Sequence, residues 1–187
     1  SNDFQDAVKI TRGNDVTLVD ANAIDLGAST VSGTYAVTAT SGNITNSGNL
    51  IITGAATFIT VATGSHIILD ASGNAFAAAV TMKADTDGDE TFGNITFVDS
   101  AAVKLHSSAG TNGDLFIDAG TDLAVGGNLS ITATTGNITQ GSEVAVGGTT
   151  TLVTSANDAT ITLNDADNAF TGALTITTND NSGTDAA

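Results

Sequence analysis

The chain has 187 residues, of which 41% are hydrophobic and only 4% aromatic, and it contains no proline, cysteine or tryptophan. Its 20 acidic and 4 basic residues give a formal net charge of −16. This composition excludes disulfides and thiolate metal sites, and it argues against nucleic acid and membrane insertion, since phosphate contacts need clustered lysine and arginine. The acidic surplus fits either solubility of a strand-rich protein or binding of divalent cations.

Short alternating apolar pairs recur along the chain and predict strands with one face turned inward. In chain order the pairs are Val8/Ile10, Val16/Leu18, Ile24/Leu26, Leu50/Ile52, Ile67/Leu69, Val80/Met82, Ile95/Phe97, Val103/Leu105, Leu129/Ile131 and Leu174/Ile176. Glycine, asparagine, aspartate and serine mark turns between them. No stretch shows a helical period, and no apolar run approaches the roughly 20 residues of a membrane span.

Repetition is the second signal. The phrase SNDFQDAVKI (1–10) returns as GNAFAAAVTM (73–82) and DNAFTGALTI (167–176), and YAVTATSGNIT (35–45) matches LSITATTGNIT (129–139) at an offset of 94. We therefore divide a single segment, residues 1–187, into units of about 1–72, 73–166 and 167–187, and we expect it to belong to a longer repetitive chain. Insertions of about 7 residues at ADTDGDE and about 15 before residue 129 together predict one additional turn.

Parallel stacking places like residues above like in successive coils, whereas an antiparallel sandwich needs tight hairpin signals, which do not dominate here. The absence of proline also fits continuously paired strands. The sequence therefore predicts an all-β fold, a parallel β-helix (β-solenoid) of about eight or nine coils with roughly 19–24 residues each.

The thrice-repeated phrase predicts a corner that is rebuilt higher up the stack. Its asparagines suit a tight turn, because asparagine tolerates left-handed backbone, and its phenylalanines fill space that small side chains leave hollow. Stacking on a ligand is the alternative role for the phenylalanines. The residues are Asn2 and Phe4, Asn74 and Phe76, and Asn168 and Phe170.

Four other asparagines lie in glycosylation triplets and equally fit turn or ladder positions. They are Asn43, Asn94, Asn128 and Asn137.

The acidic stretch DTDGDE offers the sharpest chemical candidate. Calcium prefers several oxygen ligands on a tightly turning loop. Asp85, Asp87, Asp89 and Glu90 supply such oxygens around a glycine. The complete EF-hand pattern fails, because asparagine stands where that motif needs its last glutamate. A calcium site and a solvated acidic loop both remain open, and no other cofactor is required.

Catalysis finds little support. A lyase or glycosidase site would pair carboxylates with arginine or lysine. The only arginine is Arg12, and Lys9, Lys83 and Lys104 fall at positions predicted to face outward. His66 and His106 share no motif. We expect no enzyme activity.

The phrases SGNAFAAAVTM, DNAFTGALTI, TATTGNITQ and GGTTTL resemble the repeat regions of filamentous-haemagglutinin-type exoproteins. These are bacterial surface adhesins exported by two-partner secretion or as autotransporters, and their repeats form a right-handed β-helical shaft. The resemblance implies an extracellular location at the bacterial cell surface and a structural role in an adhesin shaft, a fibre or a biofilm matrix. The implied partners are flanking coils of the same chain or another copy, in end-to-end or lateral contact.

Two other functions stay open. The first is a module that binds surface glycans or uses calcium to bind its neighbours. The second is a carbohydrate-active β-helix enzyme.

Overall fold

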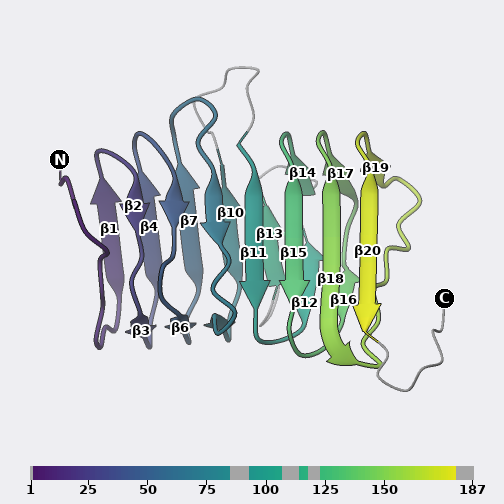
Figure 1. Cartoon of the computed structure of the whole chain (residues 1–187), viewed down its shortest axis with the longest axis horizontal. Coiled ribbons are helices and arrows are strands. Elements are labelled where there is room, and N and C mark those ends of the chain that lie inside the picture. The colour runs from purple at the N-terminus through teal and green to yellow at the C-terminus, as the bar shows by residue number, and fades with distance from the viewer. Residues whose placement is uncertain (1, 85–92, 107–113, 118–122, 180–187) are drawn as a thin grey trace.

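The computed structural model describes residues 2–84, 93–106, 114–117 and 123–179, and it is all-β, with no helix in those ranges. Valine, isoleucine and threonine occupy the strands, as their preference for extended backbone predicts. The described strands form two long and two short parallel sheets stacked along one axis (Figure 1). The fold is therefore the predicted parallel β-solenoid.

The two long sheets are named here after their first strands. The β1 sheet has the order β1 (Val16–Asp20), β4 (Tyr35–Ala39), β7 (Ala56–Thr60), β10 (Val80–Lys83), β13 (Asp114–Ile117), β12 (Val103–His106) and β16 (Ile138–Gln140). The β2 sheet has the order β2 (Ile24–Asp25), β5 (Ile44–Thr45), β8 (Ile67–Leu69), β11 (Ile95–Asp99), β15 (Leu129–Ala133), β18 (Thr150–Asn157) and β20 (Leu174–Asn179).

The two short sheets lie at opposite edges of the stack (Figure 1). One contains β3 (Ser29–Val31), β6 (Leu50–Ile52) and β9 (Ala75–Phe76). The other contains β14 (Leu123–Val125), β17 (Val144–Val146) and β19 (Ala169–Phe170).

Each coil climbs the β1 sheet, crosses to the β2 sheet and returns. Coil length is 19 residues from Val16 to Tyr35, 21 from Tyr35 to Ala56 and 24 from Ala56 to Val80, as predicted. In Figure 1 the β1 sheet runs upward on the far side and the β2 sheet downward on the near side, while the chain advances from left to right. The coil is therefore right-handed.

The number of coils also agrees with the sequence. The β2 sheet contains seven described strands. The segment before β1 adds a partial rung, because Val8 bridges Leu26 and Gly13 bridges Val31 in parallel. Together these give about eight coils.

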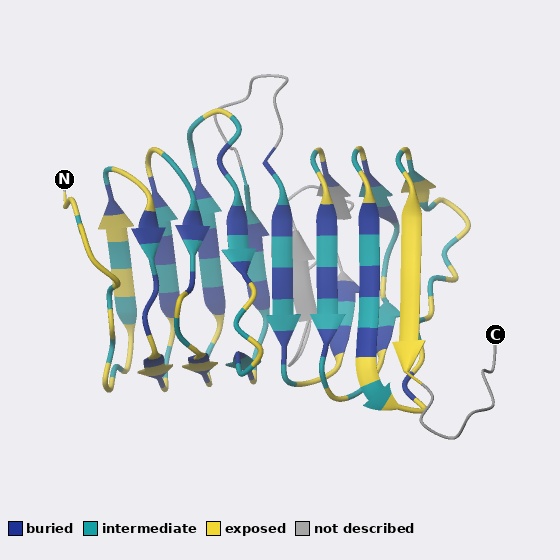
Figure 2. Ribbon diagram, in the orientation of Figure 1, coloured by how far each residue is buried: buried dark blue, intermediate teal, exposed yellow. Residues whose placement is uncertain are grey.

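A narrow core runs through the stack. The long strands alternate buried and partly exposed residues, visible as dark blue and teal bands in Figure 2. The inward positions hold mainly isoleucine, leucine and valine, one per strand face, which is how a chain with few aromatic residues fills its interior. The last strand, β20, is exposed along all six residues.

The two halves of the solenoid differ in which sheet carries the long strand. In the first half the five-residue strands β1, β4 and β7 lie in the β1 sheet, and in the second half β11 and β15 lie in the β2 sheet. The change occurs where β11 pairs with the short strand β8, Ile95 opposite Ile67. Sequence-equivalent strands of the two halves therefore occupy opposite sides of the rod.

This change corrects two expectations. The repeated phrase does not rebuild one corner, because Phe76 and Phe170 belong to different short sheets. The insertions do not add a turn to the β2 sheet either, because β11 pairs directly with β15, Ile95 opposite Leu129, 34 residues later. The longer coil instead contributes the strand β13 to the β1 sheet, between β10 and β12.

Candidate functional site

The predicted calcium ligands Asp85, Asp87, Asp89 and Glu90 lie outside the described residues, and the calcium site stays a prediction. Within the described ranges, no three histidine, cysteine, aspartate or glutamate side chains come together as a metal-binding group. The basic residues of the N-terminal segment, Lys9 and Arg12, are exposed. The side chains that make specific contacts between coils are instead amides and carboxylates at the corners.

Asn74 is the centre of an interior amide pair. It is fully buried; its Oδ1 accepts from the Leu50 N–H at 2.9 Å and from Asn46 Nδ2 at 2.8 Å, and its Nδ2 donates to the Leu69 carbonyl at 3.3 Å. Asn46 Nδ2 also donates to the Gly48 carbonyl at 2.9 Å. The pair satisfies backbone groups that the turning chain leaves unpaired.

The second unit repeats this arrangement 94 residues later. Asn168 Oδ1 accepts from the Val144 N–H at 2.9 Å and from Gln140 Nε2, while Asn168 Nδ2 donates to Gln140 Oε1 at 3.2 Å. Gln140 thus takes the place of Asn46. Sequence comparison missed this pair because its first member changes residue type; the shared amide group at offset 94 was the signal available.

Asn2 lies in a different setting from the other two asparagines of the phrase. It is exposed, bridges Asp20 and donates through Nδ2 to the Val19 carbonyl at 3.1 Å.

The phenylalanines of the phrase differ in depth. Phe76 is buried and belongs to a run of aromatic rings through the core, with centroid separations of 5.9 Å from Tyr35 to Phe58, 6.2 Å from Phe58 to Phe76 and 5.2 Å from Phe76 to Phe97. These separations are those of favourable edge and tilted contacts. Phe4 and Phe170, near the two ends of the stack, are partly buried against the same core.

Tyr35, the first ring of the run, is fully buried, and burial raises its pKa to about 12. Ser29 is the polar neighbour that offsets this rise in part, but Tyr35 Oη makes no hydrogen bond of normal geometry.

A buried carboxylate receives the backbone N–H of the phenylalanine in two of the three phrases. Asp20 is fully buried and accepts from the Phe4 N–H at 3.3 Å, and Asp99 accepts from the Phe76 N–H at 3.2 Å. Burial raises the pKa of Asp99, against the lowering effect of its backbone donors. A raised pKa in an acid means that its ionised form costs stability, and that this cost disappears as pH falls below the ordinary range.

A line of side chains, here called the corner ladder, joins successive coils just before the strands of the β2 sheet. The amide N–H of each residue donates to the side chain of the previous one: His66 to Asn43 Oδ1 at 2.8 Å, Asn94 to His66 Nδ1 at 2.9 Å, Asn128 to Asn94 Oδ1 at 2.8 Å and Thr149 to Asn128 Oδ1 at 2.7 Å. In the second unit Thr160 donates to Asn137 Oδ1 at 2.8 Å. All four asparagines of the glycosylation triplets thus bind the next coil.

His66 is the member of the corner ladder that sequence reasoning missed. Coil lengths vary, so His66 shares no constant spacing with the asparagines, and its residue type differs. Only the stacking register reveals that it occupies their position. For His106, the structure describes the backbone of β12 and not the side chain.

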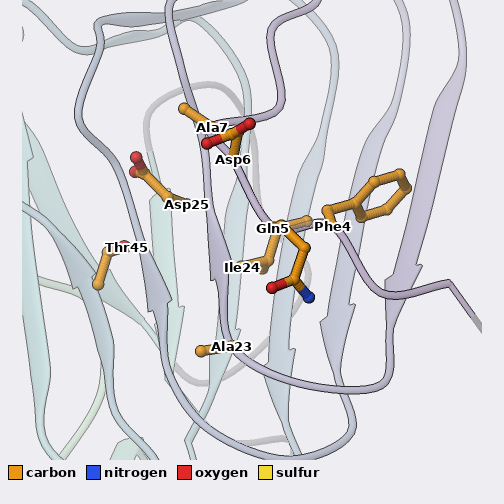
Figure 3. A pocket seen from close by; sticks show the side chains of 8 residues that line it. All are labelled: Phe4, Gln5, Asp6, Ala7, Ala23, Ile24, Asp25 and Thr45. Carbon is orange, nitrogen blue, oxygen red and sulfur yellow. The ribbon is translucent and has the colours of Figure 1, made fainter.

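One hollow lies at the N-terminal end, where residues 4–7 pass over the strand β2 (Figure 3). Its volume is about 350 Å³, and its lining includes the carboxylates of Asp6 and Asp25 together with the apolar Ile24. It opens to solvent on a terminal coil, and Asp25 already accepts the Ser47 N–H at 2.8 Å. The hollow is a poor candidate for a catalytic site.

Comparison with known proteins places the chain in a family of repeats. A family model described as repeats of unknown function (DUF5649) matches residues 13–83 and 92–177, so the chain belongs to that family. The first block contains β1 to β10, and the second runs from β11 into β20, which are the two halves of the solenoid. No curated protein and no solved structure gave a significant match. No helix in the described part of the chain could cross a membrane.

Proposed function

We propose that this chain is a structural shaft or fibre segment of a secreted bacterial surface adhesin or extracellular matrix protein. The observation that carries the proposal is the unbroken stack. Seven described strands pair in parallel in the β2 sheet, and each coil along the corner ladder is bonded to the next by side chains as well as by backbone. Such a stack resists bending and has no interior space for a cofactor.

The architecture suits a rod because each coil contacts only its neighbours, so length grows with coil number. At about 4.8 Å between neighbouring strands, each added coil lengthens the rod by that amount. The net charge of −16 keeps strand-rich rods apart in solution.

The location outside the cell is supported by the resemblance to filamentous-haemagglutinin-type repeats. The same resemblance supports flanking coils or further copies of the chain as partners. A chain that needs neither disulfide nor metal to complete its described core is suited to folding after export.

The test lengthens and shortens the rod in the native protein on its own cells. Ten added copies of residues 35–55, one 21-residue coil, should lengthen the fibres by about 48 Å in electron micrographs. Adhesion or matrix formation per cell should be unchanged, and antibodies against the segment should label intact cells. Deletion of residues 35–55 should bring β7 onto β1 and preserve adhesion. Loss of adhesion with the fold intact would assign a binding role instead, and absence of surface labelling would refute the extracellular location.

A further inference from the structure

The joint between the two halves of the solenoid lies at the corner where His66 precedes β8 and Asn94 precedes β11. The Ile67 N–H donates to the Asn94 carbonyl at 3.0 Å across this joint. The backbones are pressed together here, because a Cβ added at Gly93 would lie 2.1 Å from the Ser65 carbonyl oxygen. Only glycine allows this approach, so the joint has little room to rearrange.

The side-chain bond at this joint differs from the others in the corner ladder. Asn43, Asn94 and Asn128 accept through an amide oxygen, which carries no proton at any ordinary pH. His66 accepts through Nδ1, with the Asn94 N–H at 2.9 Å. A neutral imidazole has one acceptor nitrogen, whereas the protonated ring has two N–H donors and no acceptor. Protonation would therefore set an N–H against the N–H of Asn94.

We propose that His66 makes the joint between the two repeat units sensitive to pH. With a neutral ring the corner ladder is continuous from Asn43 to Thr149. With a protonated ring the ladder is interrupted between His66 and Asn94, so β8 and β11 keep their backbone pairing without the side-chain bond. Histidine is the side chain whose ordinary titration falls between pH 5 and 8, so mild acid is the relevant signal.

The charged groups around His66 are few among the described residues. Its bonded neighbours Asn43 and Asn94 are uncharged, and β5 and β7, which contact β8, contain no ionisable side chain. Asp70 follows β8 and Asp99 ends β11, four and five residues along the strands, or about 13 and 16 Å away at 3.3 Å per residue. In sequence, the acidic stretch 85–90 precedes Asn94 and lies outside the described residues.

The experiment measures hydrogen-exchange protection factors of single amides by NMR at pH 7.5 and pH 5.0. Protection of the Asn94 amide should fall about tenfold or more in acid, the effect of leaving one partly buried donor unpaired. The Asn128 amide, which donates to an asparagine oxygen one coil further on, is the internal control and should keep its protection. The nitrogen shift of His66 Nδ1 should report an unprotonated acceptor at pH 7.5.

Two variants separate this proposal from a general effect of acid. His66→Asn restores the amide acceptor found elsewhere in the ladder, so protection at Asn94 should become independent of pH, although His106 and every carboxylate remain. His66→Ala should lower protection at both pH values. Equal protection of the Asn94 amide in the native chain at pH 7.5 and 5.0 would overturn the proposal, and so would an undiminished fall in His66→Asn. None of these outcomes depends on whether the rod serves as a shaft.

Discussion

Replacing Asn74 with alanine tests whether the interior amide pair holds the coils together. The substitution removes the acceptor of two buried donors, the Leu50 N–H and one proton of Asn46 Nδ2, and the donor to the Leu69 carbonyl. A buried polar group left without a partner costs about 1–3 kcal/mol. Two stranded donors, less some relaxation of Asn46 toward Gly48, give an expected loss of roughly 2–5 kcal/mol in the free energy of unfolding.

The matched control is Asn168→Ala in the second unit. Asn168 makes the equivalent bonds to Val144 and Gln140, but it is only partly buried, so water can replace the lost acceptor. We expect a loss of about 1 kcal/mol there. Both losses are measured by urea unfolding followed by far-ultraviolet circular dichroism, with thermal melting as a second measurement at about 2–4 °C per kcal/mol.

The comparison has a clear failing result. If Asn74→Ala unfolds within about 0.5 kcal/mol of the native chain, or no earlier than Asn168→Ala, the pair does not stabilise the stack in the way its hydrogen bonds indicate. A third variant, Asn74→Asp, retains an acceptor for Leu50 but places a charge at a fully buried position and loses the donor to Leu69. It should also destabilise, and more at pH 7 than at pH 4.

Four further predictions follow from individual contacts. Gly148→Ala should destabilise by about 1–3 kcal/mol, because its Cβ would meet neighbouring oxygens at 2.3 and 2.6 Å, whereas Gly27→Ala, with no atom nearer than 3.5 Å, should not; urea midpoints compare them. Tyr35→Phe should leave the melting temperature equal or higher, because it removes a buried hydroxyl without a hydrogen bond. Hydrogen bonds from the backbone and the side chain of the residue 19 positions later lower the pKa of Asp15, so its contribution is present above the ordinary aspartate range and lost as pH falls through the lowered value; Asp15→Asn should change stability little at pH 7 and flatten the acid limb of the stability profile. If residues 85–90 bind calcium, adding it should raise the melting temperature and chelator should lower it, and Asp87→Asn should abolish the difference; an unchanged melting temperature removes the site.

Period-two alternation and internal repetition together were enough to predict the solenoid. Pairs such as Ile24/Leu26 and Ile67/Leu69 carry a side chain into the core at every second position, and they are buried as the pattern requires. The coil length followed from the spacing of repeated phrases because parallel pairing sets like above like within each half. These features are local, and a sequence records them directly.

The corner contacts could be predicted only in part. Asn74 stood out because its phrase recurs, whereas Asn46 and His66 make comparable bonds without belonging to any repeated phrase. Each joins residues 28 positions apart, across a coil whose length is set by the turns between them. A side chain's partner on the next coil depends on that length, so residue type alone does not reveal it.

The change of sheet between β10 and β11 explains why the repeat could not predict the columns. A phrase such as GNAFAAAVTM specifies a corner followed by a strand, and the rod has two corners at which the chain can turn from one long sheet to the other. Either corner satisfies the same parallel hydrogen bonds, so the phrase fits both: Val80 continues the β1 sheet, while its equivalent Leu174 continues the β2 sheet. Consequently, any surface feature carried by the long strand of both units faces opposite sides of the rod.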